Sequence, residues 1–153
     1  MKKYPFYLIL PDIRSCHNVG AMFRTADATG VTKLFLVGYT AEPPKIQIDK
    51  VSLGAETWMP WEHRDSLLEV VQELKDQGVH IIALEQDKKS IELSDYTLPK
   101  KPIALIVGNE VDGVDKDILH FCDDILHINM QGKKESLNVS IAAGIAMYVL
   151  GKI

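Results

Sequence analysis

Five short apolar runs recur along the chain, separated by stretches with helical periodicity. Each run is continuous and rich in β-branched residues, which is typical of strands buried on both faces of a sheet. Strands that alternate with helices favour an α/β domain, with a mostly parallel sheet flanked by helices and joined by right-handed crossovers. The predicted strands are Phe6–Leu10, Lys33–Val37, Val79–Leu84, Ile103–Val107 and Ile125–Ile128.

The stretches between the strands predict four helices, two of them closed by glycine. Gly30 ends the first, and the second begins at Asp65 or Ser66 and ends at Gly78. The segment Gly38–Trp61 has no clear assignment, although Lys45–Leu53 favours a helical turn, and loops of this length are often functional. The predicted helices are Asn18–Thr29, Ser66–Gln77, Asp115–Phe121 and Val139–Lys152.

Composition narrows the class of protein. A chain of 153 residues with 46% hydrophobic content suits one domain, residues 1–153, with an ordinary core. Cys16 and Cys122 match no disulfide framework or metal-ligand spacing, so we expect no metal site and a reducing cytoplasm. The apolar run near the start lacks a cleavage pattern, and Ile141–Leu150 is about half the roughly 20 residues that span a bilayer. We therefore expect no membrane anchor.

The net charge of −4 and the pI near 5.7 speak mildly against an RNA partner, because phosphate binding gains free energy from basic groups. A local basic surface is compatible with that balance, and evenly spread solvated charge is the equal alternative. The residues that would form such a surface are Lys2, Lys3, Arg14, Arg24, Lys33, Lys45, Lys50, Arg64, Lys133 and Lys134.

The first segment with candidate chemistry runs from Asn18 to Ala26. On a helix, one stripe is apolar and the opposite stripe combines small residues with Arg24. Small residues let a backbone or ligand approach closely, and a guanidinium is suited to holding phosphate or an anionic oxygen. Two structural alternatives stay open: a solvated Arg24, and Asn18 as a helix cap.

The second segment runs from Ile103 to Gly113. A buried strand that ends in Gly108, Asn109 and Glu110 places backbone polar groups at the carboxyl edge of the sheet, where ligands of open α/β folds bind. The segment contains neither a dinucleotide fingerprint nor a P-loop. By itself it is equally compatible with a plain strand-to-helix turn.

The third segment, Ile128–Ser140, leads into the last helix. Ser136, Asn138 and Ser140 are good helix caps, and free N–H groups at a helix start also hold anions. The helix that follows is apolar on nearly every side, so it needs cover on more than one side. In so small a domain we expect a partner subunit to supply part of that cover.

Together and in this order, the three segments resemble the three motifs of the SpoU methyltransferases of the SPOUT superfamily, from about Leu10 to Val149. The resemblance implies a SPOUT domain with a deep C-terminal trefoil knot, a homodimer, and S-adenosyl-L-methionine bound within the knot. It also implies methylation of a ribose 2′-hydroxyl of RNA, with tRNA favoured over rRNA because no RNA-recognition domain is appended.

Carried over by position, the resemblance makes Asn18 and Arg24 the catalytic pair. Asn129 and Cys16 stand where the family often has proline, which puts the local loop shape in question. The residues expected in catalysis are Arg24, Asn18, Glu110, Ser136 and Asn138. The residues expected to bind the cofactor are Leu84, Gly108, Asn109, Glu110, Gly113, Ile128, Met130, Ser136, Leu137 and Asn138.

The hydroxyl has to lose a proton during transfer, and a free arginine is a poor base because its pKa lies above about 12. We therefore expect Arg24 to stabilise the developing alkoxide and an RNA phosphate, while a water molecule or a transient deprotonation removes the proton. Two other classes remain: an inactive RNA- or nucleotide-binding module of the same fold, and a flavodoxin-like or Rossmann-like enzyme. The latter needs a glycine-rich first turn, which Pro11–Val19 lacks.

Overall fold

In the computed structural model, which describes residues 3–152, the strands form one parallel sheet of order β3-β2-β1-β6-β4-β7-β5. The strands are β1 (Phe6–Pro11), β2 (Lys33–Val37), β3 (Trp61–Arg64), β4 (His80–Leu84), β5 (Ile91–Glu92), β6 (Ile103–Ile106) and β7 (Asp124–His127). The helices are α1 (Cys16–Thr29), α2 (Ile46–Ser52), α3 (Leu67–Asp76), α4 (Lys116–Leu119) and α5 (Val139–Leu150), with 3-10 turns η1 (Ala55–Thr57) and η2 (Leu93–Asp95).

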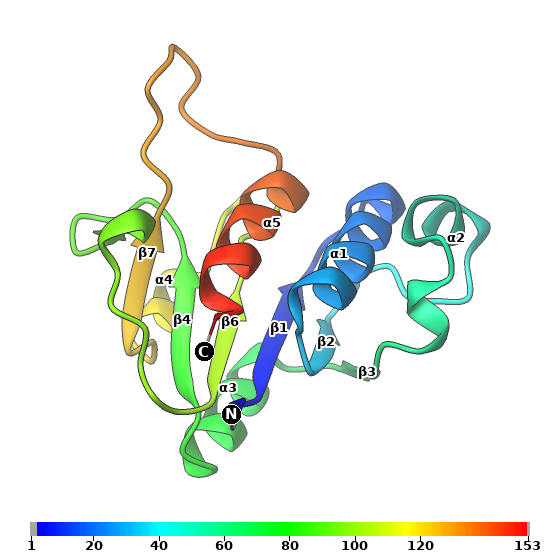
Figure 1. Cartoon of the computed structure of the whole chain (residues 1–153), viewed down its shortest axis with the longest axis horizontal. Helices are drawn as coiled ribbons and strands as arrows, with labels where there is room; N and C mark the ends of the chain where they lie inside the picture. The colour runs from blue at the N-terminus through cyan, green and yellow to red at the C-terminus, as the bar shows by residue number, and fades with distance from the viewer. Residues whose placement is uncertain (1–2, 153) are drawn as a thin grey trace.

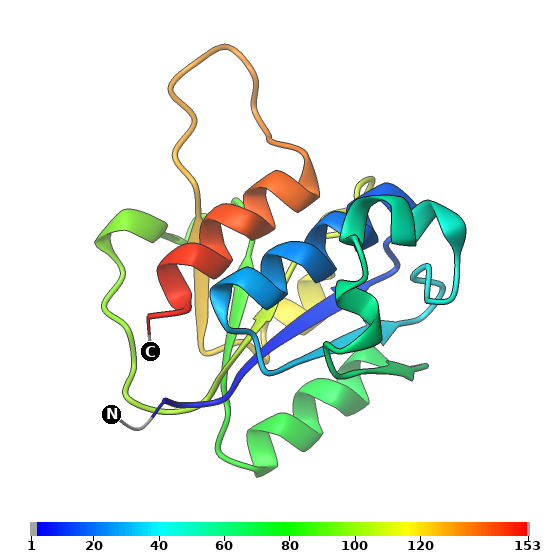
Figure 2. The same cartoon turned by 45° about the vertical axis from the view of Figure 1, so that its right-hand side comes forward.

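Helices cover both faces of the sheet (Figures 1 and 2). Helices α1, α2 and α5 lie on one face, and α3 and α4 lie on the other. Neighbouring residues of a central strand point to opposite faces, so Leu8 and Leu10 of β1 join the core under α1 and α5, while Ile9 joins the core over α3. This explains why the strand runs are apolar at every position, and it confirms the predicted α/β fold with a parallel sheet.

Helix α1 begins two residues earlier than predicted, and this changes the role of Asn18. The helix begins at Cys16 and is capped by Ser15, whose Oγ accepts from the Asn18 N–H at 3.1 Å. Asn18 is therefore not a helix cap, and its side chain, 6% exposed, is free to point across the fold. The residues predicted to share one apolar stripe, Val19, Met22, Phe23 and Ala26, are all fully buried.

Two edge strands and one helix were not predicted. Strand β3 has the sequence Trp-Glu-His-Arg, and β5 contains only Ile91 and Glu92. Both lie at edges of the sheet, where one side of the strand is unpaired and polar residues are tolerated, so neither shows the apolar run of a central strand. Helix α2 occupies the segment in which only a helical turn was predicted.

The other helices keep their predicted places with shorter ends. Ser66 caps α3 through its Oγ, which accepts from the Glu69 N–H at 3.2 Å. Helix α4 is limited to Lys116–Leu119, and α5 ends at Leu150. None of the helices within residues 3–152 has the length and apolar character needed to cross a bilayer.

Gly20 of α1 allows α2 to pack at backbone distance. A Cβ on Gly20 would lie 2.6 Å from the carbonyl oxygen of Ile48, closer than atoms can approach. We expect Gly20→Ala to lower the free energy of unfolding by about 1–3 kcal/mol, because the α2 backbone has to move. Denaturant unfolding at fixed protein concentration measures this.

Gly144 of α5 provides the matched control for that substitution. Its Cβ would lie 3.6 Å from Thr25 Cγ2, an ordinary contact. Gly144→Ala should therefore be neutral or raise the free energy of unfolding by up to about 1 kcal/mol, the gain in helix propensity. Equal losses in the two variants would contradict the close approach of α1 and α2.

Candidate active site

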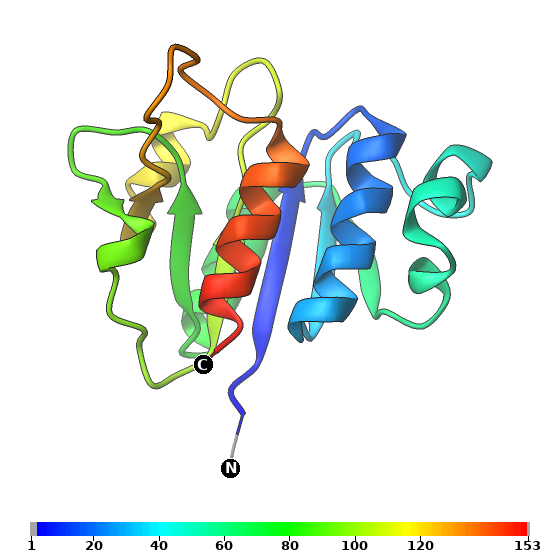
Figure 3. The same ribbon diagram turned by 45° about the horizontal axis from the view of Figure 1, so that its top comes forward.

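A pocket of about 420 Å³ opens at the carboxyl edge of the sheet, where β4, β6 and β7 end. Figure 3 shows the segments that follow β6 and β7 gathered at this edge, beside the start of α5. All ten residues expected to bind a cofactor line this one pocket, although they come from four separate parts of the chain. They are Leu84, Gly108, Asn109, Glu110, Gly113, Ile128, Met130, Ser136, Leu137 and Asn138.

The wall after β6 is a tight loop from Asn109 to Gly113. These two residues exchange backbone hydrogen bonds of 3.1 and 3.0 Å, and the Asn109 Oδ1 accepts from the Val111 N–H at 2.8 Å. A Cβ on Gly108 would lie 2.9 Å from the Gly113 Cα, so glycine is required where the loop returns on itself. The loop therefore has a fixed shape.

Glu85 holds that loop to the end of β4. Its Oε2 accepts from the Val114 N–H at 2.7 Å, and its carboxylate fills the space beside Gly113, whose φ of +70° favours glycine. Gln86 donates from Nε2 to the Ile128 carbonyl at 3.3 Å, which joins β4 to the chain after β7. Both residues line the pocket and were missed from the sequence, although a polar pair directly after a buried strand was available as a signal.

Side-chain hydrogen bonds of two asparagines connect the three candidate segments. The Oδ1 of Asn138 caps α5, accepting from the Ser140 N–H at 2.9 Å, so its Nδ2 is left to donate to Asn18 Oδ1 at 3.2 Å. The Nδ2 of Asn18 then donates to Glu110 Oε1 at 3.2 Å. A cap oxygen at one end and a carboxylate at the other only accept, so the orientation of both amides is fixed.

The other two residues expected in catalysis, Arg24 and Ser136, are not part of the hydrogen-bonded set of Asn18, Glu110 and Asn138. Ser136 lines the pocket and is exposed. Arg24 is exposed on α1 and is absent from the pocket lining, and within residues 3–152 its side chain has no ion pair or hydrogen bond. The structure of one chain therefore brings four of the five expected catalytic residues together and leaves Arg24 outside.

The pocket is acidic and apolar. Glu85, Glu110 and Glu135 line it, and no lysine or arginine is among its lining residues, all of which lie in the described part of the chain. Apolar walls suit a flat base, and carboxylates favour a ligand that carries positive charge. Phosphate groups would be repelled. The apolar lining residues are Leu84, Val107, Val111, Ile128, Met130, Leu137, Val139 and Ala142.

The basic surface proposed from the sequence is not a single patch of ten free residues. Lys33 pairs with Glu62, and Arg64 pairs with Glu73, so these two cations are already neutralised at the β2–β3 edge. Arg14 lies in the segment that follows β1, and Lys133 and Lys134 lie in the segment between β7 and α5, so all three are in loops at the carboxyl edge. Lys2 lies outside the described residues. The basic groups that remain near the pocket are thus few.

The sequence is similar to those of RNA methyltransferases. It is 38% identical over 140 residues to the tRNA (guanosine(18)-2'-O)-methyltransferase of Aquifex aeolicus, which covers 90% of this chain and 64% of that protein. It is 35% identical to the 23S rRNA (guanosine-2'-O-)-methyltransferase RlmB of Neisseria meningitidis, over 94% of this chain and 56% of that protein. The chain therefore spans less than two thirds of the length of these relatives.

Solved structures show the same fold. The A. aeolicus TrmH/SpoU tRNA modifying enzyme superimposes with a TM-score of 0.87 at 30% identity, covering 99% of this chain and 76% of that one. An AdoMet-bound rRNA methyltransferase from Sinorhizobium meliloti gives a TM-score of 0.91 at 25% identity, covering 99% of this chain and 57% of that one. The model of the SpoU rRNA Methylase family matches residues 5–148. The chain belongs to the SpoU rRNA Methylase family.

Proposed function

We propose that this chain is an S-adenosylmethionine-dependent methyltransferase that acts on a ribose 2′-hydroxyl of RNA. The observation that carries this proposal is the pocket at the carboxyl edge, which joins apolar walls with three glutamates and has no lysine or arginine in its lining. A flavin or nicotinamide dinucleotide bears phosphates, which this lining disfavours. S-adenosylmethionine combines an adenine with a cationic sulfur, and both halves fit the residues present.

The names of the relatives agree with this choice. The Aquifex and Neisseria relatives are named as guanosine 2'-O-methyltransferases, and the Sinorhizobium methyltransferase was crystallised with AdoMet. A tRNA substrate is favoured over rRNA by the slightly higher identity to the tRNA enzyme, 38% against 35%. An inactive RNA-binding module is disfavoured because the polar set around Asn18 is complete and connected.

The residues of the chain have separate tasks in this reaction. When bound, S-adenosylmethionine supplies the methyl group that the ribose oxygen accepts. Leu84, Gly108 and Ile128 would surround the adenine, and Glu110 and Asn138, which also line the pocket, would face the ribose. Asn18 is buried between these two and holds both in place. Arg24 would stabilise the alkoxide that forms while water removes the hydroxyl proton.

Arg24 has to come from a second copy of the chain in this account. On α5, Ile141, Ile145 and Tyr148 lie one turn apart on the outer face and are 55%, 40% and 67% exposed. Helix α1 packs beside α5, with Asn18 next to Asn138 and Thr25 next to Gly144, so the exposed Arg24 is carried by the helix that flanks this stripe. We propose that two copies pair through this surface, which buries the stripe and brings each Arg24 toward the pocket of the other copy.

We also propose that the C-terminal part is threaded as a deep trefoil knot, as the SpoU resemblance implies. In support, α5 lies between α1 and the segment around η2, so chain that precedes β6 flanks the helix on its other side. Tyr96 and Leu98 of that segment pack against the same core as α5. Physical reasoning from the sequence would not produce such a threading, because knots are rare among folds.

Ligand titration tests the pocket directly. We expect calorimetry to detect binding of S-adenosylmethionine and none of flavin or nicotinamide nucleotides. Ala142, on α5, lines the pocket and is half-buried, so Ala142→Phe would fill the pocket while leaving the helix intact. It should weaken binding at least about tenfold, the effect of about 1.4 kcal/mol. Ala142→Ser is the control and should bind normally; tight binding to the Phe variant would place the ligand elsewhere.

A further inference from the structure

Tyr39, in the turn after β2, is a large aromatic side chain held next to the pocket without a task in the reaction described above. It is 53% exposed. A single exposed aromatic residue is ordinary on a protein surface and does not by itself indicate a binding site. What distinguishes Tyr39 is how firmly its backbone is fixed and what its ring contacts.

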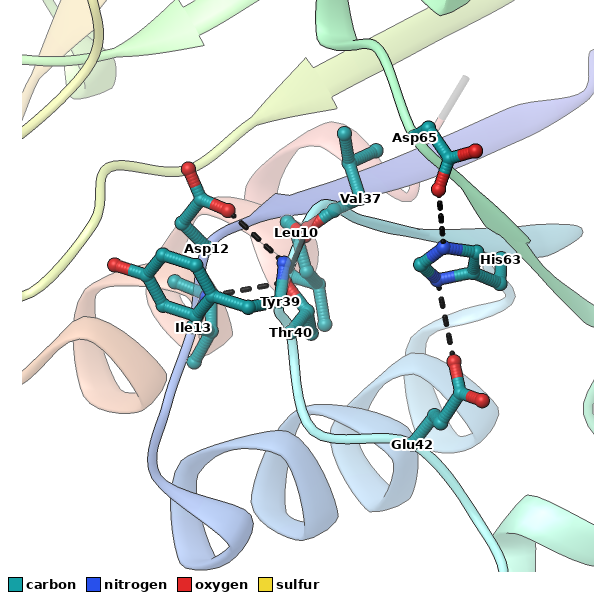
Figure 4. A network of polar contacts seen from close by, with 9 residues as sticks. All are labelled: Leu10, Asp12, Ile13, Val37, Tyr39, Thr40, Glu42, His63 and Asp65. Atoms are coloured by element: carbon teal, nitrogen blue, oxygen red, sulfur yellow. Dashed lines mark hydrogen bonds and ion pairs between the residues drawn. The ribbon is translucent and has the colours of Figure 1, made fainter.

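The turn that presents Tyr39 is rigid (Figure 4). The Tyr39 N–H donates to Asp12 Oδ1 at 3.1 Å. The Asp12 carboxylate also fills the space where a Cβ on Gly38 would lie, and Gly38 has a φ of +65°. The next residue, Thr40, is buried and donates its hydroxyl to the Leu10 carbonyl at 2.6 Å. The ring is thus exposed but its position is set by the fold.

The Tyr39 side chain contacts both a cation, Arg14, and a residue of the pocket, Asn109. The Cζ of Arg14 lies 4.9 Å from the ring centroid, within the range of a cation–π contact. The Tyr39 hydroxyl accepts a hydrogen bond from Asn109 Nδ2 at 3.2 Å, and Asn109 lines the pocket. Within residues 3–152, Arg14 forms no ion pair that would neutralise it. Tyr39 therefore contacts a residue that lines the pocket, and Arg14 lies over its ring.

The charge around Tyr39 limits what can bind there. Tyr39 lines a groove in which carboxylates, among them Asp112, Asp115 and Asp117, outnumber the single lysine, Lys116, and this excess of negative charge disfavours a phosphate. An aromatic ring with an arginine on it is suited to a neutral, flat group, and nucleobases stack on such side chains in proteins that bind unpaired RNA. About half of the Tyr39 surface is exposed even though Arg14 lies over the ring, which leaves room for such a contact.

We propose that Tyr39 and Arg14 form a stacking platform for an unpaired nucleobase next to the nucleotide that is methylated. This inference rests on the proposed function and deepens it, because it names the substrate class as RNA that is single-stranded at the target site. Stacking tolerates every base, so the platform selects unpaired nucleotides and not a particular sequence.

The experiment measures RNA binding and methyl transfer separately, on the whole chain. Fluorescence anisotropy compares a labelled RNA hairpin loop with a fully paired duplex, and labelled S-adenosylmethionine reports transfer to the same RNAs. Tyr39→Ala should weaken binding to the loop by about tenfold or more. Binding to the duplex and affinity for S-adenosylmethionine should stay unchanged.

Two variants separate stacking from other effects. Tyr39→Phe keeps the ring and loses the hydroxyl contact with Asn109, and it should bind the loop within about twofold of wild type. Trp58 is similarly exposed, at 59%, with its Nε1 bonded to Asp27, so Trp58→Ala is the matched control and should change nothing. Thermal melting confirms that each variant folds.

Each outcome decides between the proposals. Wild-type affinity in Tyr39→Ala, or an equal loss in Tyr39→Phe or Trp58→Ala, would overturn the platform even if methylation is observed. If the wild type transfers no methyl group to any RNA but binds the loop through Tyr39, the proposed function fails, and Tyr39 is left as a binding platform for unpaired RNA with no link to methylation. If the wild type binds no RNA, the platform fails as well.

Discussion

An Arg24→Lys protein is expected to bind S-adenosylmethionine like the wild type and to methylate RNA at least about 100-fold more slowly, the usual loss when one donor to a developing oxyanion is removed. Arg24 is outside the pocket lining, which is why binding should not change. Lysine keeps the positive charge but lacks the planar pair of N–H donors that fits an anionic oxygen and a phosphate together. Single-turnover kinetics with saturating RNA measure the chemical step.

Arg64→Lys is the control for that substitution, because Arg64 is held by Glu73 and has no task in the proposed reaction. It should retain its turnover. Full turnover in Arg24→Lys would remove the arginine from the mechanism and leave Asn18, Glu110 and Asn138 to account for the reaction.

An Ile145→Glu protein should be monomeric and inactive. The substitution places a carboxylate at the centre of the apolar stripe on α5, and burying an unpaired charge at an interface costs several kcal/mol. Without the second copy, no Arg24 reaches a pocket. Light scattering gives the mass, and the methylation assay gives the activity, both at the same protein concentration.

Leu68→Glu serves as the matched control, because Leu68 is similarly exposed, at 38%, but lies on α3 over the opposite face of the sheet. It should leave both mass and activity unchanged. A fully active Ile145→Glu monomer would show that each chain completes its own site.

Mixing two variants, each defective in a different part of the site, shows whether Arg24 serves the pocket of the other copy or the pocket of its own chain. If Arg24 acts across the interface, a mixed dimer of Arg24→Lys and Ala142→Phe has one working site, built from an intact arginine and an intact pocket. Random pairing then restores about a quarter of the wild-type activity, since half of the dimers are mixed and each has one of two sites. If Arg24 acts within its own chain, the mixture stays inactive.

The sequence predicted the central part of the fold because its strands are buried on both faces, as the continuous apolar runs over Leu8, Leu36 and Leu105 indicate. The edges were missed for the opposite reason. Strand β3 is polar where one side is unpaired, and β5 is two residues long. Burial is the property that leaves a pattern in the sequence, and edge strands have little of it.

The candidate site also contains residues that the sequence predicted and residues that it did not. Segments that end a buried strand were found, because the carboxyl edge of a parallel sheet is a fixed location. The contact between Asn18 and Asn138 joins residues 120 apart, and its orientation depends on which atom caps α5, so no local pattern contains it. Glu85 was missed because its role, holding the loop at Gly113, depends on the path of a different segment.

The measurement that tests the central claim most directly is mass spectrometry of nucleosides from RNA incubated with the purified protein and deuterium-labelled S-adenosylmethionine. Total tRNA and rRNA are offered separately and digested completely afterwards. We expect a labelled 2′-O-methyl nucleoside, in tRNA before rRNA, and much less of it with Ala142→Phe. Label found only on a base, or no label in either RNA while the donor binds, would contradict it.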